Sequence, residues 1–149
     1  LLTPELVKLE LESSDRWSAI VELVDLLVGQ GRIARENRDA ILDELKRREE
    51  SMSTGIGYGV AIPHTSSERV EQVVAAFGRS QGGVEFDALD GAPVHFVVLF
   101  VVPKDEFQTH LRTLAAIAKF LNDKRVRERL GEAASAERVL EILGENGAG

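Results

Sequence analysis

The stretch Ser53 to His64, STGIGYGVAIPH, is a glycine-rich segment that ends in a histidine whose backbone is restricted by the preceding proline. Its glycines occupy alternate positions, 55, 57 and 59, where the chain can adopt positive φ and an anion can approach the amides. The apolar run 60–62 predicts a strand that anchors the end of the segment. Pro63 then fixes φ directly before His64. A histidine in this setting is suited to receive an anion such as a phosphoryl group.

The bulk composition excludes several classes of partner and site. The 149 residues are 44% hydrophobic and 29% charged, which is typical of one globular domain; we expect it to span 1–149, with a polar tail at 144–149. The formal charge of −7 argues against nucleic acid or an anionic membrane as a partner. The chain has no cysteine, which excludes disulfides and cysteine zinc sites. It has neither an apolar run of membrane-spanning length nor a signal peptide, so we expect a cytoplasmic protein.

The first half of the chain predicts one short strand and two helices. Apolar and polar residues alternate over 7–11, as in a strand. The sequence Ser-Ser-Asp at 13–15 can cap a helix that runs to Val28 and stops at the glycine that follows. A second helix is predicted over 36–50, with its apolar residues facing inward.

The second half predicts a central sheet covered by further helices. Strands are expected over 70–79 and 94–102, and the second is almost continuously apolar, as in the middle of a sheet. Apolar residues then recur at helical spacing: Phe107, Leu111, Leu114, Ala118 and Leu121. Shorter helices are expected over 124–131 and 135–143. The order of elements predicts an α+β fold of three layers, a mixed β-sheet flanked by helices on both faces.

Four segments together resemble a known family. They are the stretch that ends at His64, the Arg48-Glu49 pair upstream, and the downstream strand and helix over 83–103 and 110–121. The chain resembles the IIA components of the bacterial phosphoenolpyruvate-dependent sugar phosphotransferase system, of the fructose/mannitol and nitrogen-regulatory group. The resemblance covers nearly the whole chain and implies the same three-layer fold. It also implies that the histidine ending the motif accepts a phosphoryl group from the histidine-containing phosphocarrier protein and passes it to a cysteine of a IIB component.

The resemblance implies catalytic roles for His64, His110 and Arg48. His64 would carry the phosphoryl group. Spacing alone favours a half-buried histidine at the edge of the core for His110, whereas the family places a second histidine there to support the first. Arg48 lies in a charged run whose simplest interpretation is a solvated helix end, but a guanidinium can bind two phosphoryl oxygens at once. We therefore expect Arg48 to bind the phosphoryl group, and Arg47 to be a surface residue or a contact to an acidic partner.

Thr54, Gly55 and Gly57 are the predicted phosphate-binding residues. Their amides can contact phosphoryl oxygens, although the glycines can also serve a tight turn. The spacing GxGxG, followed by a strand, does not match a dinucleotide or ATP motif, so no cofactor is expected. No short metal-ligand spacing joins His64, His95 and His110, and we expect no metal site.

Two functions are compatible with this site. The first is a phosphocarrier in sugar uptake. The second is a regulatory module of the nitrogen-related type, whose binding to transport or signalling proteins depends on phosphorylation. A domain that keeps the fold but has lost the relay is the least favoured. Tyr58, where relatives often carry asparagine, lies near the expected docking rim and bears on which partner is served.

Overall fold

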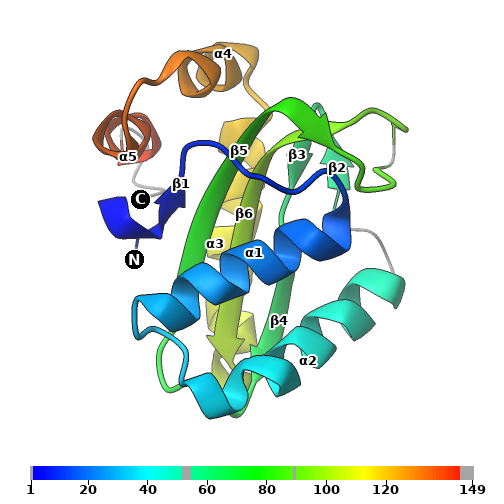
Figure 1. Ribbon diagram of the computed structural model, residues 1–149, viewed down its shortest axis with the longest axis vertical. Coiled ribbons are helices and arrows are strands. Elements are labelled where there is room, and N and C mark those ends of the chain that lie inside the picture. The colour runs from blue at the N-terminus through cyan, green and yellow to red at the C-terminus, as the bar shows by residue number, and fades with distance from the viewer. Residues whose placement is uncertain (1, 52–54, 89, 145–149) are drawn as a thin grey trace.

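The computed structural model describes residues 2–51, 55–88 and 90–144 and arranges them as one sheet between two layers of helices (Figure 1). The strand order is β1-β5-β6-β3-β2, and β4 also pairs with β6. The strands are β1 Val7–Lys8, β2 Gly55–Gly57, β3 Val60–Ala61, β4 His64–Ser67, β5 Val74–Val84 and β6 Val94–Pro103. β5 is antiparallel to β6, whereas β3 and β4 are parallel to it. The predicted mixed sheet is confirmed.

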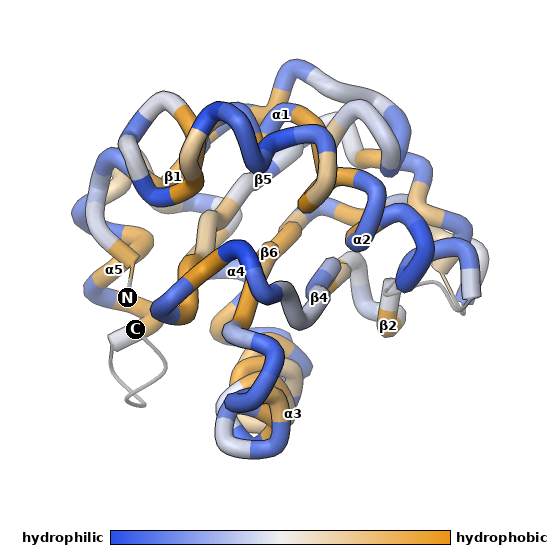
Figure 2. The backbone as a smooth tube through the Cα atoms, turned by 90° about the horizontal axis from the view of Figure 1, so that it is seen from below, coloured by the Kyte–Doolittle hydropathy of each residue, from blue (hydrophilic) through white to orange (hydrophobic). Residues whose placement is uncertain are grey.

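In the described part of the chain, five α-helices cover the sheet. They are α1 Arg16–Gly29, α2 Arg38–Ser51, α3 Phe107–Leu121, α4 Lys124–Glu132 and α5 Ala136–Gly144. Figure 2 shows α1 and α3 on opposite sides of the strands. The predicted three-layer arrangement is therefore confirmed.

The alternation of side chains along β6 divides the core into two clusters. Val97, Leu99 and Val101 pack with residues of α1 and α2, whereas Phe96, Val98 and Phe100 pack with residues of α3, α4 and α5. Successive side chains of a strand point to opposite faces, so a strand covered on both faces must be apolar throughout. This explains the continuous apolar run of β6 and supports its predicted central place.

The predicted strand bounds were wrong at two places. β1 has only two residues instead of the predicted 7–11, because the chain leaves the sheet after Lys8. Leu11 instead packs over Gly78, where a Cβ would lie 2.7 Å from the Leu11 side chain, and its amide donates to the oxygen of Arg79. β5 begins at Val74 rather than at 70 and continues to Val84.

The helix α3 buries a narrower face than predicted. Leu114, Ile117 and Leu121 are buried, but Leu111 is 44% exposed. The buried line follows spacings of three and four residues through Leu114, and Leu111 lies to one side of it. The prediction that Leu111 joins the buried stripe was therefore wrong.

A tight hairpin joins β2 to β3. Its two central residues, Tyr58 and Gly59, have φ values of 58° and 79°. Positive φ at both positions is what a two-residue type I′ hairpin requires, and it is unusual for tyrosine. The carboxylate of Asp90 accepts hydrogen bonds from the amides of Ala92 (3.0 Å) and Tyr58 (3.1 Å). Both bonds lower the pKa of Asp90, and the bond from Ala92 has the larger effect. Asp90 thus ties the hairpin to the loop before β6.

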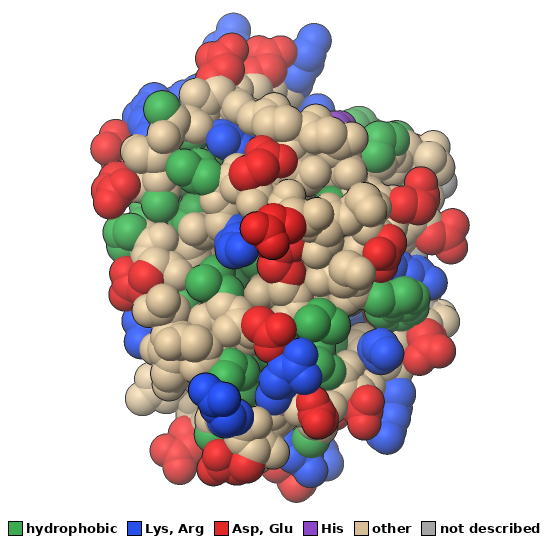
Figure 3. All heavy atoms as spheres, in the orientation of Figure 1, with side chains coloured by type: hydrophobic (Ala, Val, Ile, Leu, Met, Phe, Trp, Pro, Cys, Tyr) green, Lys and Arg blue, Asp and Glu red, His purple; other side chains and the backbone are tan. Residues whose placement is uncertain are grey.

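The face formed by α1 and α2 carries acidic and basic side chains intermingled (Figure 3). Arg38, for example, pairs with both Asp25 and Asp39. Within the described residues, no helix is long and apolar enough to cross a bilayer.

Candidate functional site

His64 is the first residue of β4, at the boundary of the sheet and the two helix layers. It pairs with Phe100 in parallel register, and the Phe100 amide donates to the oxygen of Pro63 at 2.9 Å. The strand is also tied to α2, because the buried hydroxyl of Ser67 donates to Glu44 at 2.8 Å. These contacts fix β4 between β6 and the middle of α2.

One hydrogen bond determines the tautomer of His64. Its Nδ1 lies 2.8 Å from the main-chain oxygen of Ile62. A carbonyl oxygen can only accept, so Nδ1 carries the proton. The neutral ring then keeps the lone pair on Nε2, which is the nucleophilic atom. The sequence suggested a stiff support through Pro63 but gave no sign of this acceptor.

Arg48 lies beside that nucleophilic atom. Its Nη2 is 3.5 Å from Nε2 of His64, and its side chain is exposed in the last turn of α2. The structure therefore brings together two of the three residues predicted to be catalytic. An exposed guanidinium at this point can contact oxygens of a group bound to Nε2.

The surroundings favour a neutral imidazole. Burial is the largest influence and lowers the pKa of His64; the Ile62 carbonyl raises it, Arg48 lowers it and Glu49 raises it, with a net decrease. The ring of Phe107 stacks on the imidazole, with centroids 6.3 Å apart and planes 17° apart. At neutral pH the nucleophile is therefore unprotonated at Nε2 and its ring plane is held in place.

A small open pocket lies in front of His64. It has a volume of about 370 Å³, and its lining residues are Arg47, Arg48, His64, Thr65, Ser66 and Phe107. Two guanidinium groups and two hydroxyls suit the charge and the oxygens of a phosphoryl group. Phe107 was predicted only as a core residue, since its helical spacing gave no sign of its contact with His64.

His110 does not line the pocket in front of His64. It is the fourth residue of α3, half-buried, and its Nε2 lies 3.4 Å from a carboxylate oxygen of Glu106. The ring that contacts the imidazole belongs to Phe107, which lies almost one turn earlier. A supporting role for His110 remains a prediction.

The two predicted phosphate-binding glycines lie outside the lining of the pocket in front of His64. Gly55 and Gly57 lie in β2, opposite Ala61 and Val60, and neither belongs to the lining of the pocket. Thr54 lies outside the described residues. Phosphate contacts from these residues remain predictions.

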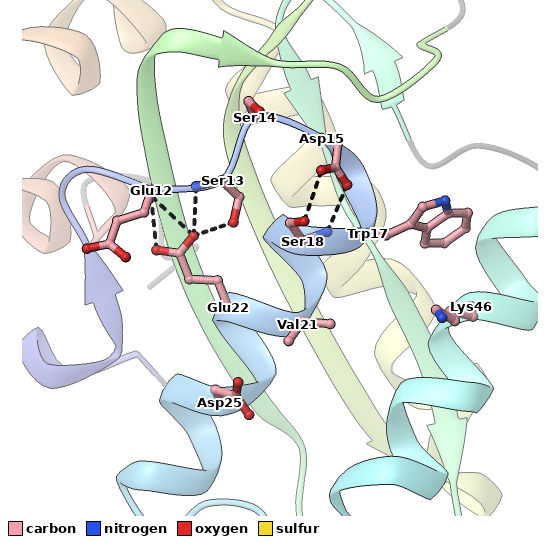
Figure 4. A pocket seen from close by; sticks show the side chains of 10 residues that line it. All are labelled: Glu12, Ser13, Ser14, Asp15, Trp17, Ser18, Val21, Glu22, Asp25 and Lys46. Carbon is pink, nitrogen blue, oxygen red and sulfur yellow. Dashed lines mark hydrogen bonds between the residues drawn. The ribbon is translucent and has the colours of Figure 1, made fainter.

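Another pocket, near the start of α1, is lined mainly by acidic and hydroxyl side chains (Figure 4). Here Glu22 accepts hydrogen bonds from Ser13 and from the amide of Glu12, and Asp15 caps α1 through Ser18. Burial opposes ionisation of Glu22, but hydrogen bonds from Ser13, Glu12 and Lys8 leave its pKa lowered. Carboxylates that already have donors repel an anion, so this pocket does not suit a phosphoryl group. Among the described residues, no group of three histidine or acidic side chains could hold a metal ion.

The comparison with known proteins agrees with the geometry at His64. The family model described as "Phosphoenolpyruvate-dependent sugar phosphotransferase system, EIIA 2" matches residues 1–146. This chain belongs to that family. As a type 2 IIA chain, it is a phosphotransfer component of the phosphotransferase system.

Relatives of this IIA chain come from both branches of the family. The fructose-specific EIIA component of Haloferax volcanii is 39% identical, over 97% of this chain and 93% of that protein. The nitrogen regulatory protein IIA-Ntr of Neisseria meningitidis is 34% identical, with a TM-score of 0.86 over 95% of this chain and 94% of that one. The IIA mannitol enzyme of Escherichia coli, solved in complex with phosphorylated IIB, shares the fold at 24% identity, with a TM-score of 0.81 over 97% and 98% of the two chains.

Proposed function

We propose that His64 accepts a phosphoryl group from the phosphohistidine of the histidine-containing phosphocarrier protein and donates it to a cysteine of a IIB component. The observation that supports this most directly is the hydrogen bond from Nδ1 of His64 to the Ile62 oxygen, which leaves Nε2 free beside Arg48. The relay operates in the cytoplasm as one step of sugar uptake.

In the first half-reaction, the lone pair of Nε2 attacks phosphorus in line with the nitrogen of the donor histidine. The new bond to Nε2 forms while the old nitrogen–phosphorus bond breaks, and its electron pair returns to the donor ring. Arg48 turns from Nε2 to the phosphoryl oxygens and balances their charge. Nδ1–H keeps its bond to Ile62 throughout, so the phosphorylated ring stays in the same orientation.

In the second half-reaction, a cysteine thiolate of IIB attacks the same phosphorus. The bond from Nε2 to phosphorus breaks, its electron pair remains on Nε2, and a sulfur–phosphorus bond forms. The mannitol enzyme that shares this fold was solved with a phosphorylated IIB partner, which supports an acceptor of this kind. His110 assists from α3, and Thr54, Gly55 and Gly57 supply amide contacts to the phosphoryl oxygens.

The relay can be tested with phosphoenolpyruvate, enzyme I and the phosphocarrier protein. Intact mass, read before and after brief acid treatment, should show one acid-labile phosphoryl group on the wild type. His64→Gln should show none while keeping its fold, whereas His95→Gln, on the remaining strand histidine, should be labelled normally. Labelling of His64→Gln would contradict the assignment.

A second function is supported by the nitrogen regulatory relative. In this alternative the chemistry at His64 is unchanged, but the phosphorylated and unphosphorylated forms bind a transport or signalling protein differently. A pull-down with both forms separates the two functions. A non-IIB protein retained by one form only would favour regulation, and transfer of the label to a IIB protein would favour sugar uptake.

A further inference from the structure

A buried acid lies next to Arg48 and belongs to no step described above. Glu49 is only 1% exposed, although it sits in a run of charged residues near the end of α2. A buried carboxylate costs free energy unless a counter-charge accompanies it. Because Glu49 directly follows Arg48 in α2, its presence calls for a physical role.

The counter-charge comes from the other helix of the same layer. A carboxylate oxygen of Glu49 lies 3.7 Å from Nη1 of Arg16, the first residue of α1. Arg16 is itself held in place: its amide donates to the oxygen of Glu85 at 2.9 Å, and its guanidinium lies 4.3 Å from the centre of the Trp17 ring. The pair links the end of α2 to the start of α1 and keeps the Glu49 charge inside the protein.

Glu49 and Arg48 act on His64 with opposite sign. Arg48 contacts the ring at Nε2. Glu49 is the next residue of α2, is buried and is paired with Arg16 of α1, and its negative charge raises the pKa of the imidazole whereas Arg48 lowers it. A phosphoryl group on Nε2 adds nearly two negative charges in the electrostatic field of these two side chains. Arg48 attracts them, and the buried carboxylate repels them with little screening from water, although its pair with Arg16 offsets part of this repulsion.

We propose that Glu49 is an electrostatic positioning residue that keeps the phosphoryl group on His64 in a readily transferable state. The proposal rests on the function proposed above. When phosphorus passes from Nε2 to a cysteine sulfur, the nitrogen–phosphorus bond breaks, its electron pair stays on Nε2, and the negative charge of the phosphoryl group leaves the field of Glu49. The acid therefore favours donation and opposes uptake, so the group does not remain on His64.

The test measures the two half-reactions separately in Glu49→Gln. Glu50→Gln is the matched control, because it removes the same charge from the exposed neighbouring position. In Glu49→Gln we expect donation to slow about threefold to tenfold and the equilibrium with the phosphocarrier protein to shift by a similar factor toward phosphorylated His64. Uptake should be equal or faster. Glu50→Gln should match the wild type in both.

A purely structural role would slow both half-reactions together, and that result would overturn the proposal, as would unchanged rates. The pKa of His64, measured by NMR without any phosphate, should also fall in Glu49→Gln and stay unchanged in Glu50→Gln. If Glu49→Gln is unfolded, the double variant Arg16→Gln/Glu49→Gln removes the ion pair and should still lower the pKa of His64, but by less, because the positive charge of Arg16 is lost as well. Absence of label on wild-type His64 would overturn the relay itself, whereas a labelled wild type without these shifts would overturn only the role of Glu49.

Discussion

The Nδ1–H of His64 donates to the main-chain oxygen of Ile62 at 2.8 Å, two residues earlier in the chain. Pro63 lies between them and limits the backbone conformations that allow this contact. The nucleophilic atom is thus defined by local geometry, while its environment comes from α2 and from the start of α3.

The phosphoryl uptake rate should stay constant through neutral pH. The pKa of His64 is lowered from 6.5, chiefly by burial, so the ring is neutral at pH 7 and uptake should fall only as pH drops through this lowered value. The unfolded chain binds this proton more readily, so the contribution of His64 to stability is complete above pH 6.5 and is lost as pH falls toward the folded pKa. Uptake rates measured against pH, and NMR titration of the His64 ring, would both report this lowered pKa. A midpoint at or above 6.5 would contradict the prediction.

Replacing Arg48 with glutamine should slow phosphoryl uptake about 100-fold, the order of effect expected for one lost charge contact in a transition state. The exposed side chain contributes little to folding, so the free energy of unfolding should change by less than about 0.5 kcal/mol. Arg47→Gln is the neighbouring control and should stay within a few-fold of the wild type. Equal losses in both variants would show that general positive charge matters, rather than the contact of Arg48 with Nε2.

Replacing Arg79 with methionine should destabilise the fold. This side chain is 9% exposed and donates to the main-chain oxygens of Leu9, Leu130 and Ala133 at 2.7–2.9 Å. Removing it leaves buried carbonyls without a donor, for an expected cost of about 3 kcal/mol in the free energy of unfolding. Urea denaturation would measure this cost, with the exposed Arg125→Met as control. A cost below about 1 kcal/mol would mean that water replaces the guanidinium.

Replacing Gly59 with alanine should weaken the hairpin before β3. Its φ of 79° disfavours any side chain, and a Cβ would lie 3.4 Å from the ring of His95. We expect a loss of about 1–2 kcal/mol in the free energy of unfolding. Gly82→Ala offers a control, because its added Cβ meets no atom within 4 Å and no positive φ is involved. Equal stability of the two variants would contradict the role assigned to the turn.

Much of the architecture could be predicted because it depends on local patterns. The continuous apolar run of β6 required cover on both faces, and the cap at Asp15 defined the start of α1. The bounds of β1 and the exposure of Leu111 could not be predicted in the same way. They depend on which neighbour occupies the space, namely the Leu11 side chain over Gly78 and the buried line through Leu114.

For the site, the sequence by itself determined the nucleophile candidate and the family to which its motif belongs. Only the tertiary structure decided which atoms surround it. The Phe107 ring, the Arg48 guanidinium and the buried Glu49 come from other elements, and their positions depend on how α2 and α3 pack against β4. The Ile62 oxygen is only two residues away, but its contact with Nδ1 depends on the backbone conformation around Pro63. Tautomer, pKa and charge balance are properties of distance and burial, which a linear pattern of residue types does not contain.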